Sequence, residues 1–139
     1  MKTTVKIILR SLAATPLKTT IVYAGILSLM YIDFRPLPLW IGDVLGYAIH
    51  FGVAYALAWW VLHKRSGRWL DGTVVVFNFV VVGALLEIFL YALLRGPSVS
   101  LVSNLFTWQS AAVNLCYFLG VACAWMQVRM ALKRGASQV

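Results

Sequence analysis

Charged residues are scarce in this chain of 139 residues, and acidic ones are the scarcest. Only 12% of the residues are charged, against roughly a quarter in soluble domains, whereas 62% are hydrophobic. This composition excludes a soluble globular domain and indicates an integral membrane protein. Each crossing of a bilayer needs about 20 residues, so we expect a single transmembrane domain over residues 1–139.

The chain also has few of the residues that metal binding and catalysis need. Its two cysteines, Cys116 and Cys123, would lie about 10 Å apart on one helix, too far for a disulfide. The histidines, His50 and His63, form no metal-ligand spacing with them. A zinc motif, a nucleophile beside a base and a phosphate-binding glycine loop are all lacking. We expect no metal and no cofactor, and rank an enzyme below a transporter or accessory subunit.

Four long apolar stretches predict four transmembrane helices, at about 16–34, 39–62, 72–94 and 104–130. Thr15 and Pro16 have the residue types of a helix N-cap and first position, so they mark the start of the first span. Strands are excluded because an open sheet in lipid would leave backbone groups unsatisfied. The expected fold is all-α, with the four spans arranged as two helical hairpins.

The cations are distributed very unevenly between the two sides of the predicted bundle. On the side of the chain ends lie ten of the twelve: Lys2, Lys6, Arg10, Lys18, Lys64, Arg65, Arg68, Arg129, Lys133 and Arg134. Only Arg35 and Arg95 lie on the other side. By the positive-inside rule both termini are expected to be cytoplasmic, and the expected location is a bacterial inner membrane. Topology and anionic lipid account for the net charge of +8, with no nucleic acid as partner.

Residues 1–14 show an amphipathic helical pattern. Four apolar residues recur at helical spacing: Val5, Ile8, Leu9 and Leu12. Three cations lie on the opposite face: Lys2, Lys6 and Arg10. This pattern predicts a short interfacial helix before the first span.

Similar short stretches recur along the chain, since residues 21–27 resemble 79–85 and residues 52–56 resemble 120–124. A duplication would give a parallel repeat about an axis along the membrane normal, although chance matches among Val, Ala and Gly are the alternative. The repeat would place small residues at matching helix-packing positions: Gly25, Gly52, Gly83 and Gly120. The alternative is that these are ordinary membrane-helix glycines.

Polar residues inside the spans are the candidates for function. Glu87 lies in the third span, where a carboxylate costs several kcal/mol unless it is neutral or paired. The rise per residue places His50 and Asn114 at a similar depth, in the half away from the chain ends. Helical stripes extend this layer, so the candidate binding or proton-coupling residues are Glu87, His50, Asn114, Tyr47, Asp43, Tyr91 and Arg95. Either they form a structural hydrogen-bond cluster or they line a cavity.

Two partial family resemblances follow from short segments. Residues 79–85, Phe-Val-Val-Val-Gly-Ala-Leu, and 43–47 resemble GtrA-like membrane proteins, which implies transfer of polyprenyl-phosphate-linked sugars across a membrane. The Asn-Arg-Arg-Trp pattern expected after the second span is missing, however. Residues 83–87, with 95–98 and Asn114, are instead similar to VanZ-like proteins, a family linked with glycopeptide-antibiotic tolerance.

Together these features predict a small membrane protein whose outward-opening polar cavity binds or translocates a lipid-linked or amphipathic substrate. Glu87 and His50 would titrate as a pair, Asn114 and Tyr47 would orient the ligand, and Arg95 would bind a phosphate. The alternatives are a proton-coupled exporter of small cations and a non-catalytic subunit of a larger complex. Expected partners are anionic phospholipid or polyprenyl-phosphate, and a second copy or another membrane protein.

Overall fold

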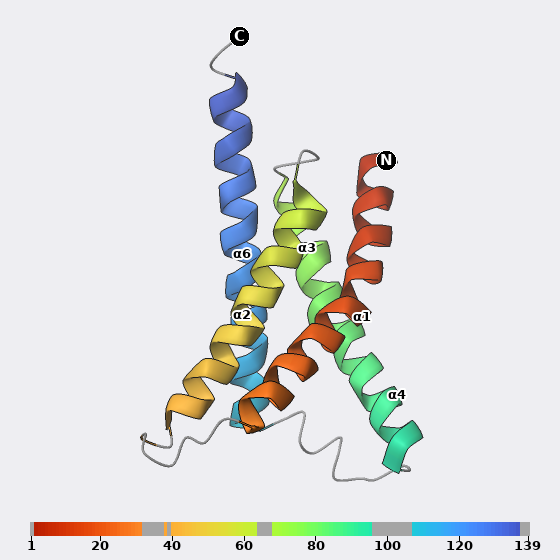
Figure 1. Ribbon diagram of the computed structural model, residues 1–139. Coiled ribbons are helices and arrows are strands. Elements are labelled where there is room, and N and C mark those ends of the chain that lie inside the picture. The colour runs from red at the N-terminus through yellow and green to blue at the C-terminus, as the bar shows by residue number, and fades with distance from the viewer. Residues whose placement is uncertain (1, 32–37, 39, 64–67, 96–106, 137–139) are drawn as a thin grey trace.

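The computed structural model describes residues 2–31, 38, 40–63, 68–95 and 107–136, and every regular element in them is a helix (Figure 1). The elements are α1 (Lys2–Met30), α2 (Trp40–Leu62), α3 (Trp69–Phe77), the π-helix η1 (Asn78–Val82), α4 (Gly83–Arg95) and α6 (Trp108–Ala136). Because α3, η1 and α4 follow one another without a gap, they form one continuous third helix. Within these described ranges, four helices are long and apolar enough to cross a membrane, as the sequence predicts.

The first helix differs from the expectation at its start. α1 begins at Lys2 and passes through Pro16, so Thr15 is not an N-cap. A proline inside a helix removes one backbone hydrogen bond and bends it, and α1 changes direction midway (Figure 1). The Thr15 hydroxyl donates to the Ser11 carbonyl at 2.8 Å, a bond within the helix that a cap would not make. Residues 2–14 therefore continue into the span, and their interfacial location stays a prediction.

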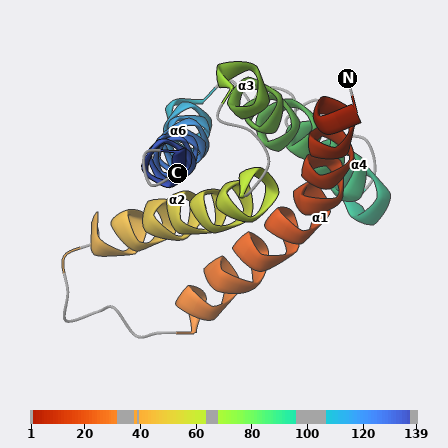
Figure 2. The same ribbon diagram turned by 90° about the horizontal axis from the view of Figure 1, so that it is seen from above.

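The helices pack most closely toward the end of the bundle where α1 begins and α6 ends. Seen from above, α2 lies between α1 and α6 and packs along both (Figure 2). The third helix contacts α1 through α3, η1 and α4, and it contacts α6 mainly through α3. The buried core includes Ala58, Val61, Val75, Val121 and Val128. Toward the opposite end the helices diverge (Figure 1).

Three of the four predicted packing glycines lie at close helix contacts. A Cβ added at Gly120 would lie 2.8 Å from the Phe51 carbonyl oxygen, so α2 and α6 meet backbone to backbone. An added Cβ at Gly25 would lie 3.2 Å from Ile49, and Gly83 is close to Lys18. Gly52 differs: it is exposed, and no described atom lies within 4 Å of its added Cβ. It takes no part in packing within the described chain, because α2 turns another face toward α6.

Large apolar side chains cover much of the outer surface. They occur on every long helix and include Leu27, Val44, Phe77, Leu85 and Leu115. A soluble monomer rarely exposes so much continuous apolar surface, whereas lipid is a suitable solvent for it. The chain is a multi-pass integral membrane protein.

Candidate functional site

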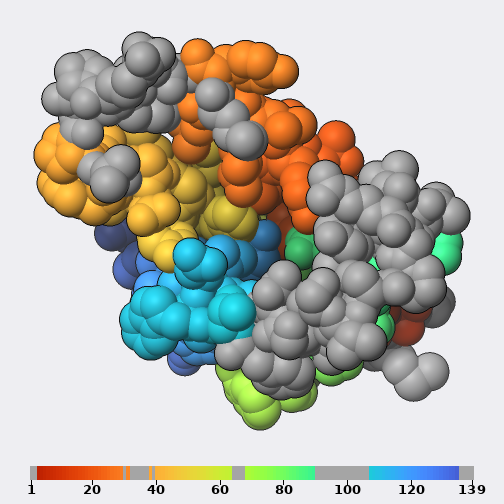
Figure 3. Space-filling model, turned by 90° about the horizontal axis from the view of Figure 1, so that it is seen from below, coloured from red at the N-terminus to blue at the C-terminus, as the bar shows by residue number. Residues whose placement is uncertain are grey.

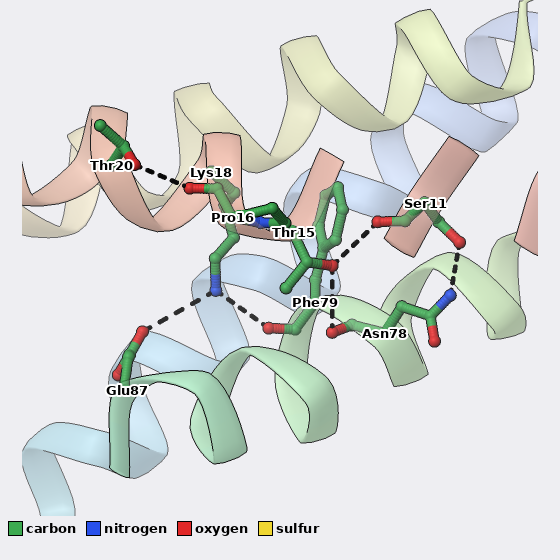
Figure 4. Close-up of polar contacts among 8 residues, drawn as sticks. All are labelled: Ser11, Thr15, Pro16, Lys18, Thr20, Asn78, Phe79 and Glu87. Atoms are coloured by element: carbon green, nitrogen blue, oxygen red, sulfur yellow. Dashed lines mark hydrogen bonds and ion pairs between the residues drawn. The ribbon is translucent and has the colours of Figure 1, made fainter. Parts of the chain in front are cut away.

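The centre of the candidate site is a lysine in the middle of α1. Lys18 is 0% exposed, and its ammonium donates to the Phe79 carbonyl oxygen at 2.9 Å (Figure 4). The same nitrogen lies 4.0 Å from Glu87 Oε1 and 4.0 Å from the centre of the Tyr117 ring. The third helix and α6 thus both contact one cation on α1. A carbonyl, a carboxylate and an aromatic face together compensate for its burial.

The position of Lys18 follows from a polar stripe on α1. Ser11, Thr15 and Lys18 follow the i, i+4, i+7 spacing of one helix face, and all three are fully buried. The Asn78 amide donates to the Ser11 hydroxyl, and the Thr15 hydroxyl is 3.4 Å from the Asn78 carbonyl oxygen (Figure 4). This polar face therefore packs against η1 and directs Lys18 toward Phe79 and Glu87.

The π-helix supplies the carbonyls that accept from Thr15 and Lys18, namely those of Asn78 and Phe79. The Gly83 N–H donates to the Asn78 carbonyl, five residues back, and to the Val80 carbonyl, three residues back, whereas a regular α-helix bonds four residues back. Short π-helical turns of this kind are frequent at functional sites because they displace backbone groups locally. A Cβ added at Gly83 would lie 2.7 Å from the Lys18 nitrogen, so glycine at this position leaves space for the ammonium.

A cavity of about 430 Å³ adjoins the ion pair in the half of the bundle where the helices diverge. Besides Lys18 and Glu87, its polar lining includes Tyr23, His50, Ser110, Asn114 and Tyr117. Seen from below, atoms of α1, α2 and α6 surround the hollow (Figure 3). This volume lies within the roughly 300–1,000 Å³ typical of small-molecule sites.

The structure brings Glu87, His50 and Asn114 together around this cavity, but it gives Glu87 a different partner from the expected one. The His50 Nδ1 atom is 2.8 Å from the Gly46 carbonyl oxygen of its own helix. Its ring lies beside Tyr117, with 5.4 Å between the ring centres. Among the described residues Glu87 pairs with Lys18, so the expected Glu–His pair is replaced by a Lys–Glu pair.

The other predicted residues are distributed differently. Asp43 and Tyr47 line an adjoining cavity of about 560 Å³, which shares His50 with the first. Tyr91 and Arg95 belong to α4, but their side chains are outside the part of the chain that the structure describes. The predicted contact of Arg95 with a phosphate stays a prediction.

Sequence reasoning misses Lys18 because the Thr15-Pro16 pair predicts a helix start, which places Lys18 at the membrane surface. The signal that could have found it is the helical spacing of Ser11, Thr15 and Lys18. Subtracting Lys18 from the ten cations on the side of the chain ends leaves nine against two. The orientation that the positive-inside rule predicts is therefore unchanged.

The chain matches no protein-family model, and neither a curated protein nor a solved structure matches it. The two family resemblances drawn from short segments stay predictions. Within the described ranges, no group of three or more His, Cys, Asp and Glu side chains could hold a metal ion. The site must accordingly be interpreted from its own geometry.

Proposed function

We propose that this protein binds, and helps to move across the membrane, the polar head of a lipid-linked or amphipathic molecule. The observation that carries the proposal is the unequal exposure of the ion pair. The Lys18 side chain is 1% exposed, whereas the Glu87 side chain is 34% exposed and lines the cavity. A carboxylate held open to a cavity inside an apolar bundle is available to a ligand.

A purely structural role is a weaker explanation of this pair. Burying two opposite charges costs desolvation that their attraction often fails to offset, so such pairs contribute little net stability. Ionisable groups within membrane spans are by default functional-site hypotheses. The partial exposure of Glu87 also exceeds what a closed structural pair requires.

The lining of the cavity supports an amphipathic ligand. Apolar side chains of Val22, Ile26, Val80 and Val113 lie beside the polar groups. Because the helices diverge at this end, a molecule could place its head in the cavity while its tail remains in lipid. A wholly polar ligand would gain nothing from the apolar part of the lining.

In this proposal the chain ends are cytoplasmic and the cavity faces the outer side of a bacterial inner membrane. The basic cytoplasmic side would hold anionic headgroups, and a second copy or another membrane protein would complete the assembly.

Native mass spectrometry of protein extracted gently from its own membrane tests the proposal. We expect a retained amphipathic molecule that is lost in Glu87→Gln. The matched control is Asp71→Asn, which removes the same charge from a buried aspartate (1% exposed) in the first turn of α3. Equal retention by both variants, or no bound molecule in the wild type, would contradict the proposal.

A further inference from the structure

The charge that the cavity offers to a ligand is negative. The Lys18 ammonium is enclosed by the Phe79 carbonyl, the Tyr117 ring and Glu87, so an incoming anion cannot contact it without displacing one of them. The exposed member of the pair is the carboxylate. Both residues line the cavity, but the Lys18 side chain is 1% exposed and the Glu87 side chain 34% exposed, so a ligand that enters contacts mainly the carboxylate.

Glu87 also keeps capacity to accept hydrogen bonds. A carboxylate has about four acceptor sites, and in the described part of the chain its partner is Lys18, at 4.0 Å. That separation is beyond hydrogen-bond distance. The second carboxylate oxygen points away from Lys18 (Figure 4). Two or more hydrogen bonds from a ligand can therefore form without breaking the contact with Lys18.

From this geometry we infer that the head group bound in the cavity is a protonated amine, held by the Glu87 carboxylate. This inference rests on the proposed function and names its substrate class. An amine in contact with Glu87 at about 3 Å is nearer to the carboxylate than to Lys18, so attraction outweighs repulsion. Tyr23, which is half exposed and lines the same cavity, adds an aromatic face that attracts cations.

Two sources could supply this chemistry, namely an aminolipid head group or a free alkylamine. The full-length protein in phosphatidylcholine nanodiscs is titrated calorimetrically with decylammonium and with decyl phosphate, which share one chain length. Butylammonium serves as the free amine with little tail. We expect decylammonium to bind about tenfold more tightly than decyl phosphate, a difference of about 1.4 kcal/mol.

The preference for ammonium should disappear in Glu87→Gln and persist in Asp71→Asn. Glu87→Asp keeps the charge on a shorter side chain and should retain part of the preference, so it replaces Glu87→Gln if that variant does not fold. Butylammonium binding as tightly as decylammonium would identify a free amine as the source. A large advantage of decylammonium over butylammonium would identify a lipid, and either result supports an amine head.

Decyl phosphate binding as tightly as decylammonium, in a manner that depends on Lys18 or Glu87, would overturn the amine assignment and leave the proposed function standing. If no amphiphile binds in a manner that depends on these residues, both the assignment and the proposed function fail.

Discussion

The ammonium of Lys18 lies 4.0 Å from the carboxylate of Glu87. Lys18 belongs to α1 and Glu87 to α4, and the whole of α2 lies between them in the sequence. Two local departures from regular helix accompany this contact. Pro16 lies inside α1 two residues before Lys18, and η1 presents the Phe79 carbonyl to the ammonium. The pair and the backbone around it therefore act as one unit, whose parts can be perturbed separately.

Removing either partner of this pair should destabilise the protein by about 1–3 kcal/mol, because the remaining charge loses its counter-ion. The cost is below that of fully buried pairs, since the Glu87 side chain is 34% exposed. The double variant Lys18→Met/Glu87→Gln should cost less than the sum of the two single variants, with a coupling of about 1 kcal/mol. The free energy of unfolding of the wild type, the two single variants and the double variant can be measured in mixed detergents. Additive effects of the two substitutions would contradict direct pairing.

Gly83→Ala should displace the Lys18 ammonium while leaving the fold intact. The added Cβ would lie 2.7 Å from the Lys18 nitrogen, too close for both to stay in place, so the flexible end of the lysine side chain must move. Because this separates the pair, we expect a loss of about 1–3 kcal/mol in the free energy of unfolding, similar to the loss on removing one partner. In this background Glu87→Gln should have little further effect on stability, because the pair is already separated.

The matched control for Gly83→Ala is Gly72→Ala, whose added Cβ would make an ordinary contact of 3.4 Å with Trp125. Glu87→Gln should keep its full effect in that background. If Glu87→Gln costs the same in both backgrounds, Gly83 does not control the position of Lys18.

Gly120→Ala should be one of the most damaging small substitutions in the bundle. Its methyl group would lie 2.8 Å from the Phe51 carbonyl oxygen and 3.0 Å from the Tyr55 nitrogen, and neither backbone atom can move without shifting α2. We expect a loss of about 1–3 kcal/mol in the free energy of unfolding. Gly52→Ala, on the exposed face of α2, should be neutral within about 0.5 kcal/mol. A similar loss at both positions would contradict the observed contact between α2 and α6.

Features of the fold and the site that depend on local sequence could be predicted, whereas contacts between distant helices could not. The four apolar helices follow from composition, and the common depth of His50, Glu87 and Asn114 follows from the helical rise. The partner of Glu87 could not be predicted in this way, because it depends on which faces of distant helices meet. Local rules also misplaced the start of the first helix: tertiary packing of its polar stripe stabilises α1 through Pro16.

The four glycines show the same limit. Their small size predicts that backbones can approach, but not which backbone lies opposite each one. Gly120 of α6 faces α2, whereas Gly52 of α2 faces outward and not toward α6. The π-helix likewise could not be predicted from the Val-rich sequence, because valines also form the regular helix α3 just before it.

The orientation of the cavity can be tested by labelling single cysteines in intact cells. Cys116 and Cys123 are first replaced by alanine, which leaves a chain without cysteine. Tyr31→Cys places a thiol after the C-terminal end of α1, beyond the cavity, where the native side chain is 90% exposed. Lys133→Cys places one near the end of α6, on the side of the chain ends. We expect a membrane-impermeant maleimide to label Tyr31→Cys in intact cells and Lys133→Cys only after lysis, because nine cations against two favour cytoplasmic chain ends.

The opposite labelling pattern would reverse the orientation and place the cavity on the cytoplasmic side. Labelling of both cysteines in intact cells would indicate that both orientations occur. The uneven distribution of cations would then not determine the orientation. Membrane fractions treated with a permeant maleimide provide the control, since both thiols must react there for the comparison to hold. Confirmation of the expected pattern would mean that an amine reaches Glu87 from the outer leaflet, so that any transport begins at, or ends on, the outer side.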